Sequence, residues 1–407
     1  MSEKKRKRSV GSYRKRGENL WELSVSAGKG AYGKRNRPTK TVRCKESEVE
    51  KKLALFVAEV EKGQYIEPSH LTIAEFSERW VRDYADKEIA PSTRATYMLR
   101  LKKIVLPAMG HLRLEQVKPL HIKDLLRNLE EPGTRLDGDK SKGMGADSII
   151  QVHRVLSAIF RMAVELEIIQ DNPCARVKAP RPPKRNLKVW DENQTFAALV
   201  ALESHPVALR TMITMAALTG LRRGELLGLE WKHIDLEKRT AKIIQVSQNV
   251  TGTGVITKDP KTAASTRLLA LPEMVCNLLR THKAVQNAKR LKLGSKWEES
   301  DRIFTTWNGR PMHPNTANKW MRDFIADYNE GKELEEQLPV IRFHDLRHSA
   351  ATIMITQGVD VGTVAKNLGH SRPSITTDIY YNALMTAQER AANKMDELFA
   401  GAVKKSQ

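Results

Sequence analysis

The 407-residue sequence predicts a multidomain protein of the α+β class, mainly helical with small β-sheets. At roughly 100–200 residues per domain, this length allows two to four domains. Apolar residues make up 40% of the chain and charged residues 29%, so each domain can bury a core and disorder throughout is excluded. The alternating pattern of strands is confined to residues 10–45, 241–250 and 266–271, and helical periodicity governs most of the remainder.

Residues 1–63 predict a small, strongly basic domain that combines a sheet with a helix. Trp21, Leu23 and Val25 alternate with polar neighbours, which is the period-two pattern of a half-buried strand. Residues 46–62 carry apolar side chains at helical spacing instead, so they predict a helix.

Residues 71–177 predict an all-helical domain. Thr72 and Glu75 have the spacing of a capping box, which opens the first helix. Pro107 is expected to end the second helix, because proline cannot continue the backbone hydrogen bonds. The predicted helices cover residues 72–87, 91–106, 119–129 and 146–168. Residues 178–189 follow as a basic, proline-rich linker, which is stiffened by its prolines and either lies on an anion or is simply solvated.

Residues 190–407 predict a mostly helical domain with a strand patch and a C-terminal tail. The predicted helices cover residues 206–219, 273–291, 314–328, 345–357, 360–367 and 373–398. The two strand-like segments are residues 241–250 and 266–271, and residues 251–265 are expected to form the connection between them.

The net charge of +21 favours a polyanionic partner, and nucleic acid is the usual one. Residues 1–45 alone hold 15 Lys and Arg against three Glu. The basic cluster at residues 4–8 also matches a nuclear address, a pattern of low specificity. An anionic membrane is the weaker alternative, because no basic amphipathic helix is found near the N-terminus. Charge alone also fits a soluble protein with a basic tail.

Cysteine usage and hydropathy favour a reducing cytoplasm. Three cysteines far apart in the chain exclude a disulfide scaffold and a cysteine-rich zinc site. No run approaches the ~18 apolar residues of a membrane span, and the N-terminus lacks an apolar signal segment. No His, Asp and Glu group has metal-ligand spacing, and no glycine-rich ATP loop occurs, so neither metal nor cofactor is predicted.

Two clusters in the C-terminal half place cations where they can hold a phosphate. In the motif TGLRRGELL, Arg222 begins a helix, where a guanidinium near backbone N–H groups can cradle an anion, and Glu225 can orient it from one turn away. In the motif RFHDLRH, His344 and Arg347 share a helical face and can both reach one phosphate. Taken alone, each cluster fits an ordinary surface pair or a capped helix start better.

Two further clusters supply a lysine and a phenol. The segment KDPKTAASTR, residues 258–267, is a basic connection between the two strand-like segments. The motif LGH ends at His370, and Tyr380 follows ten residues later. Taken separately, the first fits a plain hairpin loop, and the second fits structural or solvent-facing side chains.

In this order and spacing, the four clusters resemble the tyrosine recombinase family, the integrases of phages and integrative conjugative elements, over residues 219–381. The resemblance implies a catalytic domain of tyrosine recombinase type in which Glu225 orients the first arginine. Lys258 competes with Lys261 for the lysine position, and Tyr381 is the alternative nucleophile. The catalytic set that the resemblance implies is Arg222, Lys261, His344, Arg347, His370 and Tyr380.

The family's reaction explains these residue types. The resemblance implies cleavage and rejoining of DNA through a 3′-phosphotyrosine and a Holliday junction, without metal or ATP. A phenol with its ordinary pKa of about 10 needs a base or a positive field, which His344 and the arginines would supply. Arg222 and Arg347 would clamp the non-bridging phosphate oxygens, with His370 as a further donor. Lys261 would protonate the departing 5′ oxygen.

The resemblance also implies the partners. These are double-stranded DNA attachment sites with core and arm sequences, a homotetramer on DNA, and accessory proteins for excision or DNA bending. Residues 1–63 resemble an arm-site-binding domain, residues 71–177 a core-site-binding domain, and residues 190–407 the catalytic domain. The C-terminal helix is expected to pack either in cis or on a neighbouring subunit. The basic side chains expected to contact DNA are Lys4, Arg6, Arg14, Arg16, Arg181, Lys184 and Arg185.

Two other functions fit parts of the pattern. A type IB topoisomerase uses a similar set of side chains, but the basic N-terminal domain and the TGLRRGELL context argue against it. A non-catalytic DNA-binding protein on the same scaffold would not need every catalytic position filled, as it is here.

Overall fold

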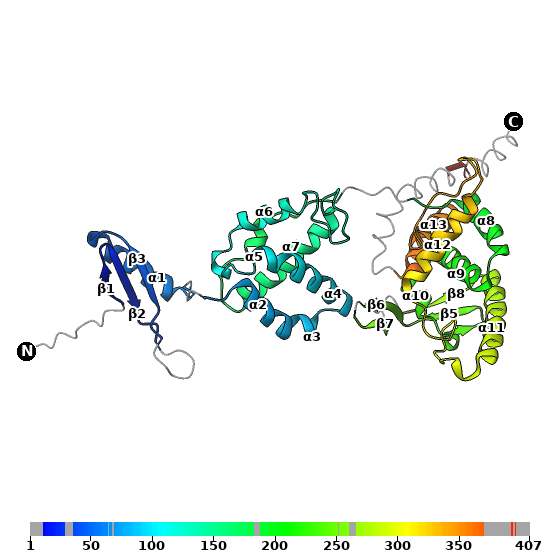
Figure 1. Ribbon diagram of the computed structural model, residues 1–407, viewed down its shortest axis with the longest axis horizontal. Coiled ribbons are helices and arrows are strands. Elements are labelled where there is room, and N and C mark those ends of the chain that lie inside the picture. Colours follow the sequence, from blue (N-terminus) through cyan, green and yellow to red (C-terminus); the bar gives the residue numbers. More distant parts are fainter. Residues whose placement is uncertain are drawn as a thin grey trace, which may run out of the picture. The chain divides into compact units, whose positions relative to one another are not determined.

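The structure, a computed structural model, describes residues 11–28, 36–63, 65–66, 69–182, 188–250, 252–259, 266–369, 392–393 and 395. Its fold is mainly helical with small antiparallel sheets, as predicted (Figure 1). The chain divides into two compact units, Met1–Pro183 and Lys184–Gln407. In the part of the chain described, no helix has the length and apolar character of a membrane span. The helix predicted over residues 373–398 lies outside the described residues, except for three positions near its end.

The basic N-terminal segment forms a three-stranded antiparallel sheet in the order β1-β2-β3, followed by a helix. Trp21, Leu23 and Val25 of the middle strand are buried in one cluster with Val49 and Phe56 of the helix. The predicted half-buried strand and helix are therefore confirmed. The elements are β1 (Gly11–Gly17), β2 (Leu20–Val25), β3 (Thr39–Arg43), η2 (Glu46–Glu48) and α1 (Val49–Glu61).

The helical part of the same unit packs around the long helix predicted over residues 146–168, whose inward-facing apolar residues are buried. The capping box is also present, because the backbone N–H of Glu75 donates to the Thr72 hydroxyl and that of Thr72 donates to the Glu75 carboxylate. The elements are α2 (Ile73–Trp80), η3 (Val81–Ala85), α3 (Asp86–Glu88), α4 (Pro91–Arg100), η4 (Leu101–Val105), α5 (Leu106–Met109), η5 (Leu114–Gln116), α6 (Pro119–Asn128), α7 (Ala146–Glu165) and η6 (Pro173–Arg176).

Two of the predicted helix ends are wrong. The second helix does not end at Pro107 but continues to Met109. A π-helical turn, η4, precedes α5, and Pro107 then lies in the first turn of α5, where its missing N–H costs no hydrogen bond. Helix α7 ends three residues early, because Glu167 adopts a left-handed conformation with φ of 54°.

The C-terminal unit is built around the apolar helix predicted over residues 206–219. In the structure this helix packs against α8, α10, α11, α12 and α13. The elements are α8 (Glu192–Ala201), η7 (Leu202–Ser204), α9 (Val207–Thr219), α10 (Arg223–Gly228), η8 (Trp231–His233), β4 (Ile234–Asp235), β5 (Thr240–Ile243), β6 (Val246–Val250), β7 (Gly254–Lys258), β8 (Arg267–Ala270), α11 (Glu273–Leu293), η10 (Gly294–Lys296), α12 (Pro314–Asn329), α13 (Asp345–Thr356) and α14 (Val361–Leu368).

The strand patch is more elaborate than predicted. The segment 241–250 supplies two strands to two different sheets, β4-β5-β8 and β6-β7. The expected connection 251–265 contains strand β7, which pairs with β6 in an antiparallel hairpin. Gly252 and Gly254 turn this hairpin with φ of 87° and 89°, which only glycine adopts without strain. The hairpin lies directly against α10, because a Cβ on Gly228 would come within 2.8 Å of the Gln245 carbonyl oxygen.

Candidate active site

A tight reversal between α9 and α10 positions Arg222. Gly220 caps α9 in the left-handed conformation, with φ of 65°, and a Cβ there would lie 2.6 Å from a methyl group of Leu368. Glycine is therefore required both by the backbone and by the space. Arg222 follows as the N-cap residue of α10, so its side chain leaves the chain beside the end of α14.

Glu225 orients Arg222 as predicted. The Glu225 carboxylate accepts from the Arg222 backbone N–H at 3.0 Å and from Nη1 at 2.7 Å, and its side chain is 1% exposed. The guanidinium belongs to the N-cap residue of α10. Its other partners are carbonyl oxygens, those of Leu368 at 3.2 Å and Gly369 at 3.0 Å.

Arg347 reaches the same place from α13. Its side chain is buried, and it donates to the Gly220 carbonyl oxygen at 2.8 Å and to the Leu368 carbonyl oxygen at 2.6 Å. Arg222 and Arg347 thus share one acceptor, although they lie 125 positions apart in the sequence. The C-terminal carbonyls of a helix lack partners within the helix, and they carry partial negative charge that attracts cations.

Arg267 is a third arginine at this helix end, and no role was predicted for it from the sequence. It makes a two-pronged contact with Glu225, with nitrogen–oxygen distances of 2.9 and 3.2 Å, and it donates to the Asn367 carbonyl oxygen at 2.8 Å. A signal was present in the sequence. Arg267 lies two positions before Leu269 in a strand, so the two side chains point to the same face of the sheet. Both are buried, whereas Leu268 between them is exposed.

The buried Glu225 carboxylate is shared between two guanidinium groups. Burial alone would raise the pKa of Glu225, but hydrogen bonds and charge from Arg267, together with the charge of Arg222, more than offset it and lower the pKa. Glu225 is therefore an anion at neutral pH. It compensates part of the positive charge that the arginines bring to the end of α14.

His344 lies at the N-cap position of α13 and is exposed, unlike the buried Arg347. Desolvation and then the charge of Arg347 lower its pKa from the usual value, and a smaller contribution comes from Arg222. The His348 ring contacts it edge-on with centroids 5.5 Å apart, and its own pKa is lowered to about 4, first by desolvation. Both imidazoles are thus neutral at pH 7 and able to accept a proton.

The other predicted site residues divide into two groups. Lys258 ends strand β7, Arg14 and Arg16 are exposed on β1, and Arg181 is exposed near the end of the first unit. Lys4, Arg6, Lys184, Arg185, Lys261, His370, Tyr380 and Tyr381 lie outside the described residues. Among the residues that are described, no group of three or more His, Cys, Asp and Glu side chains is arranged to hold a metal ion.

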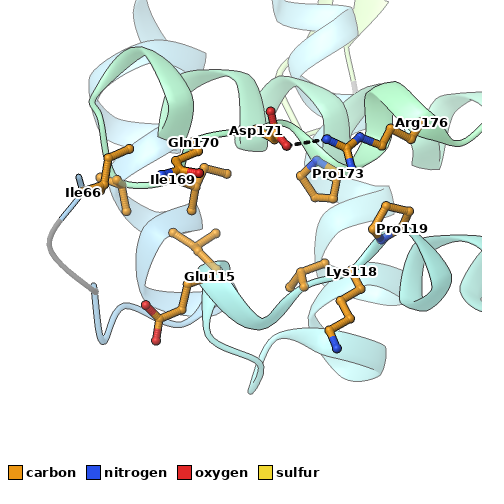
Figure 2. Close-up of a pocket in the computed structure, with 12 residues that line it drawn as sticks. Ile66, Glu115, Lys118, Pro119, Ile169, Gln170, Asp171, Pro173 and Arg176 are labelled. Carbon is orange, nitrogen blue, oxygen red and sulfur yellow. Dashed lines mark hydrogen bonds and ion pairs between the residues drawn. The ribbon is translucent and has the colours of Figure 1, made fainter. Parts of the chain in front are cut away.

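A separate pocket of about 330 Å³ lies in the helical part of the first unit (Figure 2). Glu115 and Lys118 line one side, and an ion pair of 2.6 Å between Asp171 and Arg176 lines the other. Its charged side chains are exposed and of both signs. None of the predicted site residues lines it, so it is not part of the candidate active site.

Comparison with known proteins gives the family. The phage integrase family matches residues 188–387, and the SAM-like N-terminal domain of phage integrases matches residues 72–129. The ICEBs1 integrase of Bacillus subtilis is 31% identical over 63% of this chain and 67% of its own length. The chain belongs to the phage integrase family.

The similarity to family members extends over nearly the whole chain. A XerC-like tyrosine recombinase of Caldanaerobacter subterraneus subsp. tengcongensis is 25% identical over 95% of this chain and 98% of its own. In fold, the Tn1549 transposon integrase, solved with a circular intermediate DNA, matches 79% of this chain and 99% of its own with a TM-score of 0.64 at 20% identity. This phage integrase family member is a tyrosine-type site-specific recombinase that acts in the recombination of mobile elements.

Proposed function

We propose that this recombinase breaks and rejoins DNA through a covalent bond between Tyr380 and a 3′ phosphate, with Arg222 and Arg347 holding the scissile phosphate. The observation that carries the proposal is the convergence of both guanidinium groups on the Leu368 carbonyl oxygen, just before the segment that contains Tyr380. A guanidinium has five N–H donors, so each arginine can keep this carbonyl contact and still donate to a phosphate oxygen.

The fixed positions of the arginines suit a transition state that gathers negative charge. Glu225 and the carbonyls at the end of α14 hold Arg222 and Arg347 before the DNA binds, so little reorganisation is needed during reaction. The Arg222 side chain is 36% exposed, which leaves it accessible to a phosphate. Arg267 donates from both Nη1 and Nη2 to the Glu225 carboxylate, so it acts on the carboxylate instead of the phosphate.

In the proposed reaction, the Tyr380 phenol oxygen bonds to phosphorus and the bond from phosphorus to the 5′ oxygen breaks. The phenol proton passes to neutral His344, for which a lowered pKa leaves the imidazole unprotonated at pH 7. The 5′ oxygen takes a proton from the lysine after β7, Lys261 in preference to Lys258, and His370 adds a donor to the phosphate. Rejoining reverses these steps with the 5′ hydroxyl of the partner strand.

Strand exchange between two duplexes requires four cleavages, and each consumes one nucleophile. We infer that four copies of this chain assemble on two attachment sites and that the reaction passes through a Holliday junction. Accessory proteins for excision or bending, and a bacterial nucleoid location, belong to the same proposal.

The DNA contacts are proposed along the basic segments. The face of the sheet opposite Trp21 and Leu23 carries Arg14, Arg16 and Arg43, and it supports an arm-site-binding role for residues 1–63. The proposed core-site domain is 71–177, followed by the 178–189 linker and the 190–407 catalytic domain. In the linker region, exposed Arg181 would contact backbone phosphates. Lys184 and Arg185 that follow it would do the same, as would Lys4 and Arg6 in the N-terminal tail.

A suicide DNA substrate tests this function directly, because the cut strand dissociates and the covalent complex accumulates. The wild-type chain should give an adduct that maps by mass spectrometry to the peptide containing Tyr380. Tyr380→Phe should form no adduct while its affinity for the core site stays within about twofold, since only the nucleophile is lost. Tyr381→Phe is the matched control and should still form the adduct. An adduct on Tyr380→Phe would refute the assignment.

A further inference from the structure

A buried arginine, Arg302, lies in the catalytic unit outside the arginine cluster of the candidate active site. Its side chain is 4% exposed. The backbone places it, because residues 301–303 pair antiparallel with residues 229–231 through an isolated bridge between Glu230 and Arg302. Directly opposed residues of an antiparallel pair project from the same face. The Arg302 guanidinium therefore lies beside the Glu230 carboxylate, with Nε 3.6 Å from Oε1.

The guanidinium of Arg302 joins two further segments. Its Nη1 donates to the carbonyl oxygen of Gly228, the last residue of α10, and its Nη2 donates to the hydroxyl of Thr257 on β7. The Gly228 carbonyl oxygen also accepts from the Gln245 side-chain amide at 2.7 Å, just before β6. A planar guanidinium fixes the direction of each of its hydrogen bonds, so this contact sets both distance and orientation between α10 and the hairpin.

These two segments carry different parts of the proposed reaction. Arg222, the N-cap residue of helix α10, is proposed to hold the phosphate. Strand β7 leads into the lysines proposed to protonate the 5′ oxygen, since Lys258 directly follows Thr257 and Lys261 follows three positions later. The Arg302 contact thus directly links α10, the helix that carries the proposed phosphate-binding arginine, to strand β7, which leads into the two lysines.

Stability alone is a poor explanation for a charge in this position. Burial lowers the pKa of Arg302, and the negative charge of Glu230 only partly opposes that effect. Buried ion pairs generally contribute little more to stability than well-packed apolar side chains of the same volume, but they fix geometry. The Arg302 charge is costly to bury, and the guanidinium hydrogen-bonds to both α10 and β7. Its contribution is therefore to align these two segments.

We propose that Arg302 is a positioning residue, which holds strand β7 against the end of α10 so that the following lysine reaches the leaving 5′ oxygen. This inference rests on the proposed function, because it assumes that a lysine after β7 is the general acid. Arg302 itself does not touch the DNA in this account.

The test compares two substrates that differ only in the need for that acid. In one, the scissile 5′ oxygen is ordinary; in the other, sulfur replaces it as a 5′-bridging phosphorothiolate. When the P–S bond breaks, the thiolate leaves without a proton, because a thiol has a pKa of about 8.5 and is a far better leaving group than an alcohol. A variant that only misplaces the acid should therefore be slow on the first substrate and normal on the second.

Thr257→Val is the main variant, because it removes the hydroxyl but keeps the shape and strand preference of an exposed residue. Thr257→Ser is its matched control, since it retains the hydroxyl. Arg302→Lys keeps the buried charge without the planar fork. Core-site affinity should stay at the wild-type value for both Thr257 variants, and a cooperative thermal transition of each variant checks that it is folded.

Thr257→Val and Arg302→Lys should cleave the ordinary substrate about tenfold more slowly, the order expected for losing a hydrogen bond to a charged group. Both should cleave the phosphorothiolate at the wild-type rate, and Thr257→Ser should be normal on both substrates. Equal slowing of Thr257→Val on both substrates, or no slowing on the ordinary one, would overturn the positioning role.

The same substrates test the proposed function separately. Lys261→Ala or Lys258→Ala should be slow on the ordinary substrate and restored on the phosphorothiolate, which would identify the acid. If neither lysine variant is restored, the lysine assignment fails. The comparison of Thr257→Val with Thr257→Ser would then still decide whether the Arg302 contact acts on departure of the 5′ oxygen.

Discussion

At the scale of single residues, the site depends on one buried carboxylate between two cations. The Glu225 carboxylate binds Arg222, which lies three positions earlier in the chain, and Arg267, which lies on a strand more than forty positions later. The two guanidinium groups repel each other, so neither could hold the other in position without the carboxylate between them. The pairing of Glu225 with Arg222 was predictable from their spacing, whereas the contact with Arg267 required the fold.

Replacing Glu225 with Gln should destabilise the catalytic unit by about 3 kcal/mol, because it leaves the buried Arg267 guanidinium and the partly exposed Arg222 guanidinium without their counter-charge. Urea unfolding of the full chain measures this change. The control is Glu298→Gln, which breaks a surface ion pair with Arg310 whose two side chains are at least half exposed. That control should cost less than about 1 kcal/mol. Equal losses for both variants would show that Glu225 has no special role.

At the scale of elements, helix periodicity was the most reliable guide and strand connections the least. The amphipathic α7 and the apolar α9 were predictable because their apolar residues recur at helical spacing over many turns. The β7 strand was missed, because its five residues, GVITK, lie in a basic segment that also fits a loop. The continuation of the helix past Pro107 depended on a π-helical turn, which leaves no sequence pattern of its own.

The α9–α10 reversal gives an element-scale prediction. Gly220→Ala should strain the left-handed backbone and also push the new methyl group into Leu368. We expect a loss of stability of about 1–3 kcal/mol for the strained backbone alone and at least a tenfold loss of cleavage, because Arg222 follows two residues later. Melting temperature and suicide-substrate cleavage measure the two effects.

Gly252→Ala is the control for this variant. Gly252 is also left-handed, with φ of 87°, but a Cβ there meets nothing within 4 Å. It should show the backbone strain without the displacement of Arg222. Similar cleavage by the two variants would mean that the reversal at Gly220 does not position the arginine.

At the scale of the whole molecule, the uneven charge indicates how the chain divides its work. Residues 1–45 contribute +12 of the total net charge of +21. Deleting residues 1–63 should therefore reduce recombination on full attachment sites and flatten the dependence of binding on salt, because fewer phosphate contacts release fewer counterions. Cleavage of an isolated core site should persist. An unchanged affinity and salt slope would exclude DNA contact by this segment.

In the proposed mechanism, Arg222 and Arg347 neutralise the charge of one scissile phosphate. A direct test uses Arg222→Ala on a normal phosphodiester and on a methylphosphonate, in which a methyl group replaces one charged oxygen at the scissile position. The variant should lose at least a hundredfold in cleavage of the phosphodiester and recover most of the loss on the methylphosphonate, while Arg223→Ala behaves alike on both. An equal loss by Arg222→Ala on the two substrates would contradict the claim.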